Sequence, residues 1–491
     1  MELPNVKYRE LDLSSVPQSR KDTIHGLIVQ TLFGFDDKPY FVASLDQFKR
    51  LFGGYDADAS PYFPQIKRAI ARGVRFYIQR LIAANAVAAT YAFSGNNVTL
   101  SARTKGTWAN NKVGFTLTVA PTFKLTLTYA DDPTMNEVHG AATFADLATA
   151  INRDSSLIIC TLSGGYTVPA AVSAVTYLTG GANGSWADTA AKDTDINALY
   201  SKFNDIVDMD TISQLGTFSK AGVENLAAYV SLRGDVMGVF EVDPASSIAA
   251  AKTFLTNGST GLGTLKNNLL AGYYGSKLTA WSPEAQDDLE GPVLLDVLSV
   301  WSQSDTLMGN RLYPPAGPQR GLIDGVKTFS TNLLSPARTA EVNELVNASV
   351  NIVGSHPNFG PVVWGAKTMN RMNSALDDIH TRRMLLDLRK NLTPIYQRGL
   401  FQINEPSSWR AMYVQVKPIL DELVRAKVIA PAYHYVGDQD VSRISDVVYN
   451  NVTDLGNGIY KVKIVLVPFG YIETIEFTVI ANSLTGLITI E

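Results

Sequence analysis

The sequence predicts a multidomain protein of the α/β and α+β classes, with a layered α/β core, an inserted β-rich domain and a C-terminal α+β domain. Three observations support this fold class. Helical and strand patterns alternate on both sides of a long stretch rich in Thr, Val and Ser, and that stretch itself alternates like β-strands. The last third combines long helical patterns with two alternating strands. A chain of 491 residues also exceeds what one hydrophobic core usually holds.

The first twenty residues are polar, contain a short alternating piece at 11–13, and are expected to form an arm. Compact patterns begin after residue 25. Ser44 is a suitable N-cap and Gly53 a suitable stop for a helix between them. In chain order we expect a strand at 26–31, helices at 44–52 and 63–72, and a strand at 74–80.

From about residue 88 to 185 the chain becomes β-rich, with few charges and clear alternation at 114–119 and 124–129. One helix is expected within it, at 143–152. Cys160, the single cysteine, lies in an apolar run and is expected to pack as a small hydrophobe in a strand. This stretch is predicted to be an insertion into the core.

Alternation of helices and strands resumes after the β-rich stretch, which indicates that the layered core continues. The expected elements are helices at 188–201, 220–232, 244–255 and 293–307 and a strand at 236–242. The last third is expected to hold helices at 337–347, 373–399 and 407–426 and strands at 459–467 and 471–480.

Charge and composition limit the partners. With 42 Lys and Arg against 46 Asp and Glu, the net charge of -4 offers no overall basic surface for nucleic acid. One cysteine permits no disulfide framework and fits folding in a reducing cytoplasm. The start of the chain has no signal-peptide pattern, and polar or helix-breaking residues interrupt both long uncharged stretches, so we expect no membrane span.

Signatures of enzymes are missing from the sequence. No phosphate-binding Gly-rich loop and no Gly-x-Ser-x-Gly motif occurs, and the five histidines never fall at metal-ligand spacing. The loop at 56–67 starts like a calcium-binding loop, but Pro61 and Lys67 occupy the positions of its Gly and Glu. We therefore expect no catalytic residues, no cofactor site and no metal site.

Two local features stand out. The C-terminal strands each have one apolar face, and both chain ends are strand-like, which fits strand addition between subunits; folding back within one chain is an equally good reading. The second feature is a basic group on one predicted helix, comprising Arg382, Arg383, Arg389 and Lys390. This group could dock on an acidic partner, although a solvated helix face explains it as well.

Several segments, in order, resemble the contractile phage tail sheath proteins. Residues 360–369 (GPVVWGAKTM) are similar to the family's WGARTL-like segment, and residues 379–385 (IHTRRML) to its V-R-R-L-L helix. Residues 404–406 (NEP) precede Trp409, and residues 461–480 are similar to the closing strands. Near the amino end, the matching segments are 41–53 and 74–80. The family's F-E-P-N motif differs here, because residues 401–406 read FQINEP.

The resemblance implies a layered α/β sheath core and extended N- and C-terminal arms, in a structural subunit that polymerises as stacked hexameric rings around an inner tail tube. It implies these limits: N-terminal arm 1–20, central α/β sheath domain 21–88 and 186–355, outer β-rich domain 89–185, C-terminal conserved sheath domain 356–481, and C-terminal arm 482–491. Strand exchange between subunits would involve Leu11, Leu13, Val16, Val462, Ile464, Ile475, Phe477, Leu487, Ile488 and Ile490.

Under this resemblance the basic group at Arg382, Arg383, Arg389 and Lys390 would face the inner tube. The other implied partners are further copies of the chain and the baseplate and tail terminator proteins. The implied location is the virion tail, after assembly in the host cytoplasm. Two alternatives remain open: the sheath of a phage-like bacterial injection system, and a secreted β-rich surface or adhesin protein.

Overall fold

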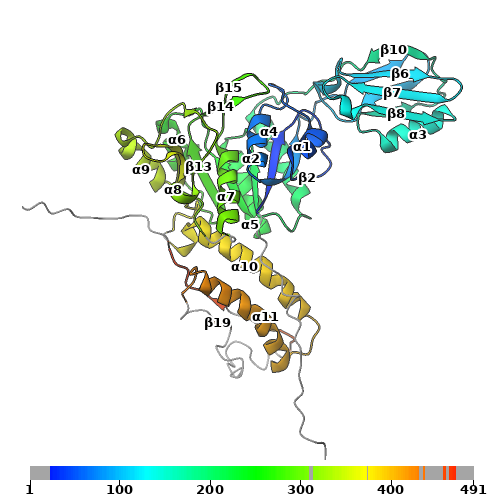
Figure 1. Ribbon diagram of the computed structural model, residues 1–491. Helices are drawn as coiled ribbons and strands as arrows, with labels where there is room; N and C mark the ends of the chain where they lie inside the picture. The colour runs from blue at the N-terminus through cyan, green and yellow to red at the C-terminus, as the bar shows by residue number, and fades with distance from the viewer. Residues whose placement is uncertain are drawn as a thin grey trace, which may run out of the picture. The chain divides into compact units, whose positions relative to one another are not determined.

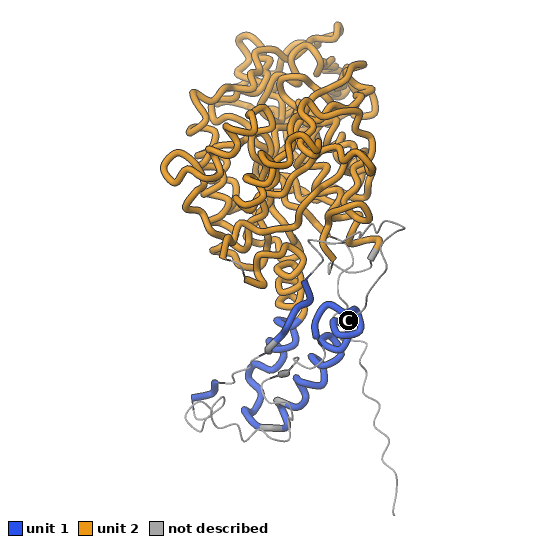
Figure 2. The backbone as a smooth tube through the Cα atoms, turned by 90° about the vertical axis from the view of Figure 1, so that its left-hand side faces the viewer, with its two compact units in different colours: residues 1–16, 392–491 blue, residues 17–391 orange. Residues whose placement is uncertain are grey.

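A computed structural model of the chain describes residues 23–308, 313–372, 374–430, 435–436, 457–459 and 464–470. The chain divides into two compact units, one of residues 17–391 and one of residues 1–16 and 392–491, which Figure 2 colours separately. The mixed α/β multidomain class predicted from the sequence is confirmed (Figure 1).

The larger unit is built on an eight-stranded sheet in the order β18-β17-β13-β12-β11-β1-β3-β2. Neighbouring strands run parallel, except that β2 and β18 at the two edges are antiparallel. Its strands are β1 (Ile24–Gln30), β2 (Tyr40–Val42), β3 (Arg75–Leu81), β11 (Thr211–Gln214), β12 (Met237–Glu241), β13 (Leu270–Gly275), β17 (Val350–His356) and β18 (Gly360–Trp364). Every residue of β12 and β13 is buried, as expected of strands covered on both faces.

The helices of this region pack in two groups: α1 on α2 and α2 on α7, and separately α4 on α5 and α6 on α9. Their bounds are α1 (Leu45–Phe52), α2 (Phe63–Ala71), α4 (Thr189–Tyr200), α5 (Lys220–Arg233), α6 (Ile248–Thr256), α7 (Leu294–Met308), α8 (Gly317–Arg320) and α9 (Thr339–Asn347). The expected cap is confirmed, because the Ser44 side chain accepts a hydrogen bond from the amide of Gln47 and Gly53 ends the helix. The expected alternation of helices and strands is confirmed along this core.

The β-rich stretch forms two small sheets, β10-β6-β7-β8 and β4-β5-β9, with one helix. Their bounds are β4 (Thr90–Phe93), β5 (Val98–Ala102), β6 (Val113–Thr118), β7 (Phe123–Tyr129), β8 (Glu137–Ala141), α3 (Phe144–Asp154), β9 (Ile158–Leu162) and β10 (Val172–Tyr177). They share a hydrophobic core separate from that of the large sheet. Cys160 is buried in β9, and burial raises the pKa of its thiol to about 11, which confirms its packing role.

A third small sheet, β15-β14-β16, is made of β14 (Leu278–Ser282), β15 (Asp287–Gly291) and β16 (Thr328–Phe329). Two long helices follow the large sheet along the chain, α10 (Ile379–Arg398) and α11 (Pro406–Arg425). In the smaller unit, β19 (Tyr435–Val436) pairs antiparallel with β20 (Ile464–Val465). Bonds from the Ala430 amide to the Val467 carbonyl and from the Phe469 amide to the Val428 carbonyl extend this pairing.

The division between the two units falls inside α10, at Asn391. β18 returns antiparallel along β17 and completes the large sheet. The domain limits predicted from the sequence, including a C-terminal domain that starts at residue 356, stay predictions.

No helix within the described ranges is both long enough and apolar enough to span a bilayer.

Glu241, at the end of β12, is a buried carboxyl that holds the start of α7. Its two oxygens accept hydrogen bonds from the amides of Val293, at 2.8 Å, and Leu294, at 3.1 Å. Burial raises the pKa of Glu241 from its ordinary 4.5 to about 8, although the two amide bonds favour the charged form. One buried carboxyl therefore links the stability of the core to pH.

The raised pKa of Glu241 predicts that the free energy of unfolding falls as the pH rises. The folded chain keeps this proton where the unfolded chain has released it, so the contribution is complete below 4.5 and is lost as the pH rises through about 8. The expected slope is at most about 1.4 kcal/mol per pH unit. Chemical denaturation across this range should show the slope in the unmodified chain and a weaker one in Glu241→Gln. Equal slopes in both proteins would contradict the assignment.

Candidate functional site: the basic anchor of helix α10

The basic residues in the first part of α10 lie against one end of the large sheet, where the parallel strands begin. We call the following residues the α10 anchor: Thr23, Ile24, Asp210, Asp305, Arg383, Arg389 and Lys390. All of them belong to the larger unit. The sequence predicted a basic helix face but not that its side chains would be used inside the chain.

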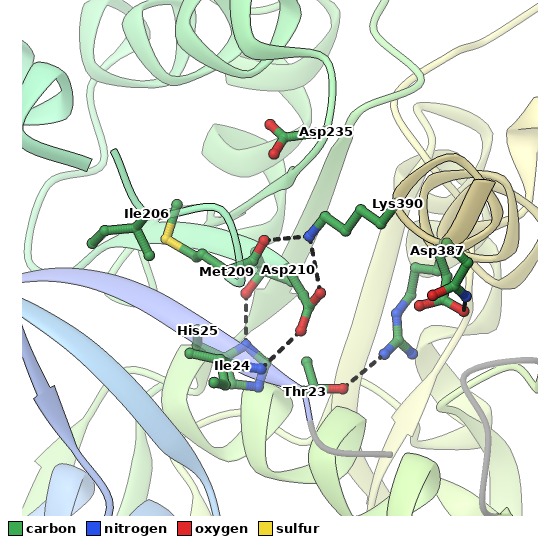
Figure 3. A network of polar contacts seen from close by, with 12 residues as sticks. Thr23, Ile24, His25, Ile206, Met209, Asp210, Asp235, Asp387 and Lys390 are labelled. Atoms are coloured by element: carbon green, nitrogen blue, oxygen red, sulfur yellow. Dashed lines mark hydrogen bonds and ion pairs between the residues drawn. The ribbon is translucent and has the colours of Figure 1, made fainter. Parts of the chain in front are cut away.

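Asp210 comes directly before β11 and contacts both the first strand and α10. Its Oδ2 accepts a hydrogen bond from the amide of Ile24 at 2.9 Å, and its own amide donates to the Ile24 carbonyl at 2.9 Å. Its Oδ1 lies 3.1 Å from Nζ of Lys390, which also donates to the Met209 carbonyl (Figure 3). One carboxylate thus binds the start of β1 on one side and α10 on the other.

Asp305, in the last turn of α7, forms the second, more deeply buried contact. Its Oδ2 accepts hydrogen bonds from the hydroxyl of Thr23 and from Nη2 of Arg383. The guanidinium of Arg383 also lies over the ring of Trp301, 4.7 Å from its centre. Arg383 is 5% exposed and Asp305 1% exposed, so this ion pair is shielded from water.

Arg389 and Arg382 have more exposed positions on α10. Nη1 of Arg389 donates to the carbonyl of Gly234 at 2.7 Å, just after the end of α5, where a cation is favoured by the helix dipole. Arg382 is half-buried, and burial, with a smaller effect of Arg389, lowers the pKa of its guanidinium. Of the four basic residues predicted to face a tube, Arg383 and Lys390 therefore pair with carboxylates of their own chain, and Arg389 bonds a backbone carbonyl of its own chain. Contact of this group with a tube stays a prediction.

His25 stabilises the same end of the large sheet from inside the core. The buried imidazole lies 2.6 Å from the hydroxyl of Thr211 on β11 and 2.9 Å from that of Ser302 on α7. It therefore ties β1 to the two elements that carry Asp210 and Asp305.

Both edges of the large sheet are occupied. The segment 321–323 covers β18, with bonds from the Ile323 amide to the Pro361 carbonyl, 2.9 Å, and from the Val363 amide to the Gly321 carbonyl, 2.8 Å. At the other edge, the Gln47 side chain bonds the Phe41 carbonyl and the Ala43 amide beside β2. Added strands would therefore have to pair elsewhere.

The residues predicted to exchange strands fall mostly outside the described residues. Ile464 is described, and it pairs with Val436 in the β19–β20 ladder. Those outside the described residues are Leu11, Leu13, Val16, Val462, Ile475, Phe477, Leu487, Ile488 and Ile490. Their role in strand exchange stays a prediction.

The part of the chain that the structure describes contains no group of three His, Cys, Asp or Glu side chains arranged to hold a metal ion. In doubly wound sheets, ligands bind beyond the carboxyl ends of the strands, where the direction of connection reverses. Here that point lies between β1 and β11. The phenol of Tyr62 lies against Gly216, just after β11.

Comparisons with known proteins agree with the resemblance seen in the sequence. No protein-family model matches the chain. A tail sheath protein of Vibrio phage KVP40 is 33% identical over 91 residues, which are 18% of this chain and 13% of the length of that protein. The sequence match thus spans only a small part of the phage protein.

The structural matches extend over nearly the whole chain. A sheath tail protein of Listeria innocua superposes with a TM-score of 0.60 at 14% identity, covering 86% of this chain and 90% of that one. The helical sheath of the anti-feeding prophage in its contracted state superposes with a TM-score of 0.58 at 12% identity, covering 98% of this chain and 100% of that one. The chain therefore has the fold of the sheath proteins of contractile tails and injection systems.

Proposed function

We propose that the chain is the structural subunit of a contractile tail sheath, which polymerises around an inner tube and shortens to drive that tube through a host envelope. The observation that carries the proposal is the fold similarity over 98% of the chain to a helical sheath in its contracted state.

The mechanism that we propose needs no nucleotide. An extended lattice of subunits would be metastable, and subunits would move largely as rigid bodies into a more compact packing after a trigger at one end. The large core sheet suits such motion, because its strands and helices form one continuous hydrophobic cluster. A few kcal/mol of added contact per subunit, on the order expected for small interface changes, would sum over many copies.

Connections between subunits would come from the two chain ends. The arms at 1–20 and 482–491 would add strands to the C-terminal sheet of neighbouring copies, the region that contains Ile464. Backbone pairing tolerates varied side chains and can persist while subunits rotate. Contacts at the outer strands of the large sheet support pairing at the C-terminal sheet instead. The segment 321–323 and the Gln47 side chain already bond backbone groups of the large sheet's outer edges, so those groups cannot bond an added strand.

The further partners and the location follow from the same proposal. They are the inner tail tube, the baseplate and the tail terminator proteins, in a virion tail assembled in the host cytoplasm. The structures matched also include the sheath complex of an extracellular contractile injection system in its contracted state, with a TM-score of 0.56 at 13% identity. Genes that neighbour this one would separate the two. Electron microscopy of purified protein separates both from a secreted adhesin, because only a sheath forms hollow striated cylinders.

Removal of residues 482–491 should abolish assembly without unfolding the subunit. The deleted strand would belong to the neighbour's sheet, so the protomer keeps its own core. We expect a soluble truncated protein with an unchanged melting temperature and no cylinders by electron microscopy. Ile488→Pro, which removes one ladder donor, should weaken assembly, and Ile488→Val, which keeps it, should not. Normal cylinders from the truncated chain would contradict the proposal.

Contact with the tube is proposed for Arg389, which is exposed, and for Arg382, which is half-buried. Charge reversal at both, to Glu, should release the tube from purified sheath–tube complexes at lower salt than in the unmodified protein, because attraction to acidic side chains becomes repulsion. Arg410→Glu with Arg425→Glu, an equal change at two exposed positions of α11, serves as the control. Unchanged tube retention in the double variant, with its folding confirmed by thermal melting, would refute this contact.

A further inference from the structure

The start of the first strand and the start of α10 meet the same two carboxylates, although they are far apart in the sequence. Thr23 and Ile24 lie where the chain enters the core, and α10 leads out of it toward the smaller unit. One carboxylate oxygen of Asp210 accepts a hydrogen bond from the Ile24 amide, and the other accepts one from Lys390. A single oxygen of Asp305 accepts hydrogen bonds from both the Thr23 hydroxyl and Arg383.

The contacts at Asp305 are closed into a triangle, because Nη2 of Arg383 also lies 3.3 Å from the Thr23 hydroxyl. All three side chains are at least nine-tenths buried. The second carboxylate oxygen, Oδ1, has no hydrogen-bond partner among the described residues. Among the described residues, the hydrogen bonds to the Asp305 carboxylate therefore come from Thr23 at the chain entry and from Arg383 on α10, and loss of either partner leaves a buried charge less compensated.

The two carboxylates also share a rigid support. Asp210 precedes β11 and Asp305 lies on α7, and the imidazole of His25 bonds both of these elements through Thr211 and Ser302. The first strand is therefore held to the same two elements from inside the core, one residue from Ile24. The two carboxylates cannot shift independently of each other without breaking these buried hydrogen bonds.

From this arrangement we infer that Asp210 and Asp305 are positioning residues that couple the entry of the chain into the core to helix α10. Displacement of one segment loosens the other, because both bind the same two carboxylates. Neither segment can move away without removing a partner from a buried charge. Coupling of this kind is reciprocal. In an assembled polymer this coupling would transmit a force on the N-terminal segment directly to α10. The coupling itself is a property of the single subunit.

Hydrogen–deuterium exchange of the soluble full-length subunit tests the coupling. Asp305→Asn and Asp210→Asn keep the side-chain size and remove the charge. Each should speed exchange at least about tenfold in two segments together, the start of β1 at 23–26 and the first part of α10 at 379–391, with α5 unchanged; tenfold corresponds to about 1.4 kcal/mol of local opening. Exchange that rises in one segment alone, or in neither, overturns the inference.

Asp296→Asn is the matched control. Asp296 also lies on α7, is 2% exposed and forms buried ion pairs, but its partners are Arg68 and Arg72 on and beside α2. This variant should leave exchange at 379–391 unchanged. If it loosens α10 as much as Asp305→Asn does, the effect is a general loss of stability and the inference fails.

The reciprocal experiment uses one change at each end. Thr23→Val removes the hydroxyl at the chain entry and should speed exchange in α10, and Arg383→Met removes the cation of α10 and should speed exchange at 23–26. An effect confined to the segment that carries the substitution contradicts coupling. Because exchange is measured before assembly, a failure here leaves the proposed sheath function untouched, and failure to form cylinders would leave the coupling untouched.

Discussion

The constraint on which the rest of the structure depends is the satisfaction of backbone groups in a parallel sheet that is buried on both faces. Water cannot reach the interior strands, so each amide and carbonyl of β12 and β13 must pair with a neighbouring strand. The same need extends to the edges. The segment 321–323 hydrogen-bonds the outer side of β18, and the side chain of Gln47 hydrogen-bonds backbone groups beside β2. The backbone groups that form these bonds cannot pair with a further strand.

In the proposed function, strand exchange between subunits involves the smaller unit. Its described residues include a short ladder, in which Tyr435 pairs with Val465 and Val436 with Ile464. Two-stranded ladders are marginal by themselves and gain from additional strands. We therefore propose a division of roles, in which the large sheet forms a rigid core and the terminal segments connect subunits.

Buried carboxyl groups make directional contacts that determine which elements of the core pack together. Glu241 holds the start of α7 by two amide bonds, Asp296 binds two arginines, and Asp210 and Asp305 bind α10. Each of these carboxylates joins elements distant in sequence. A hydrophobic cluster would hold the same elements together less selectively, because apolar contacts have no direction.

The sequence by itself determined the local structure. Periodicity and capping residues located several helices and strands of the core and of the β-rich stretch within a few residues, because the pattern of apolar side chains is a local property: Ser44 caps α1, and Cys160 packs in β9. Strands such as β11, β13 and β17 were not located from the sequence. The sequence also revealed the basic group on α10 and the resemblance to sheath proteins, which the comparisons confirm at the level of the fold.

Only the tertiary structure decided what the basic group binds. Asp305 lies 78 residues before Arg383 and Asp210 lies 180 residues before Lys390, and neither belongs to a recognisable motif, so no spacing rule connects the partners. Pairing of distant segments depends on how whole layers pack, and a local pattern carries no information about that packing.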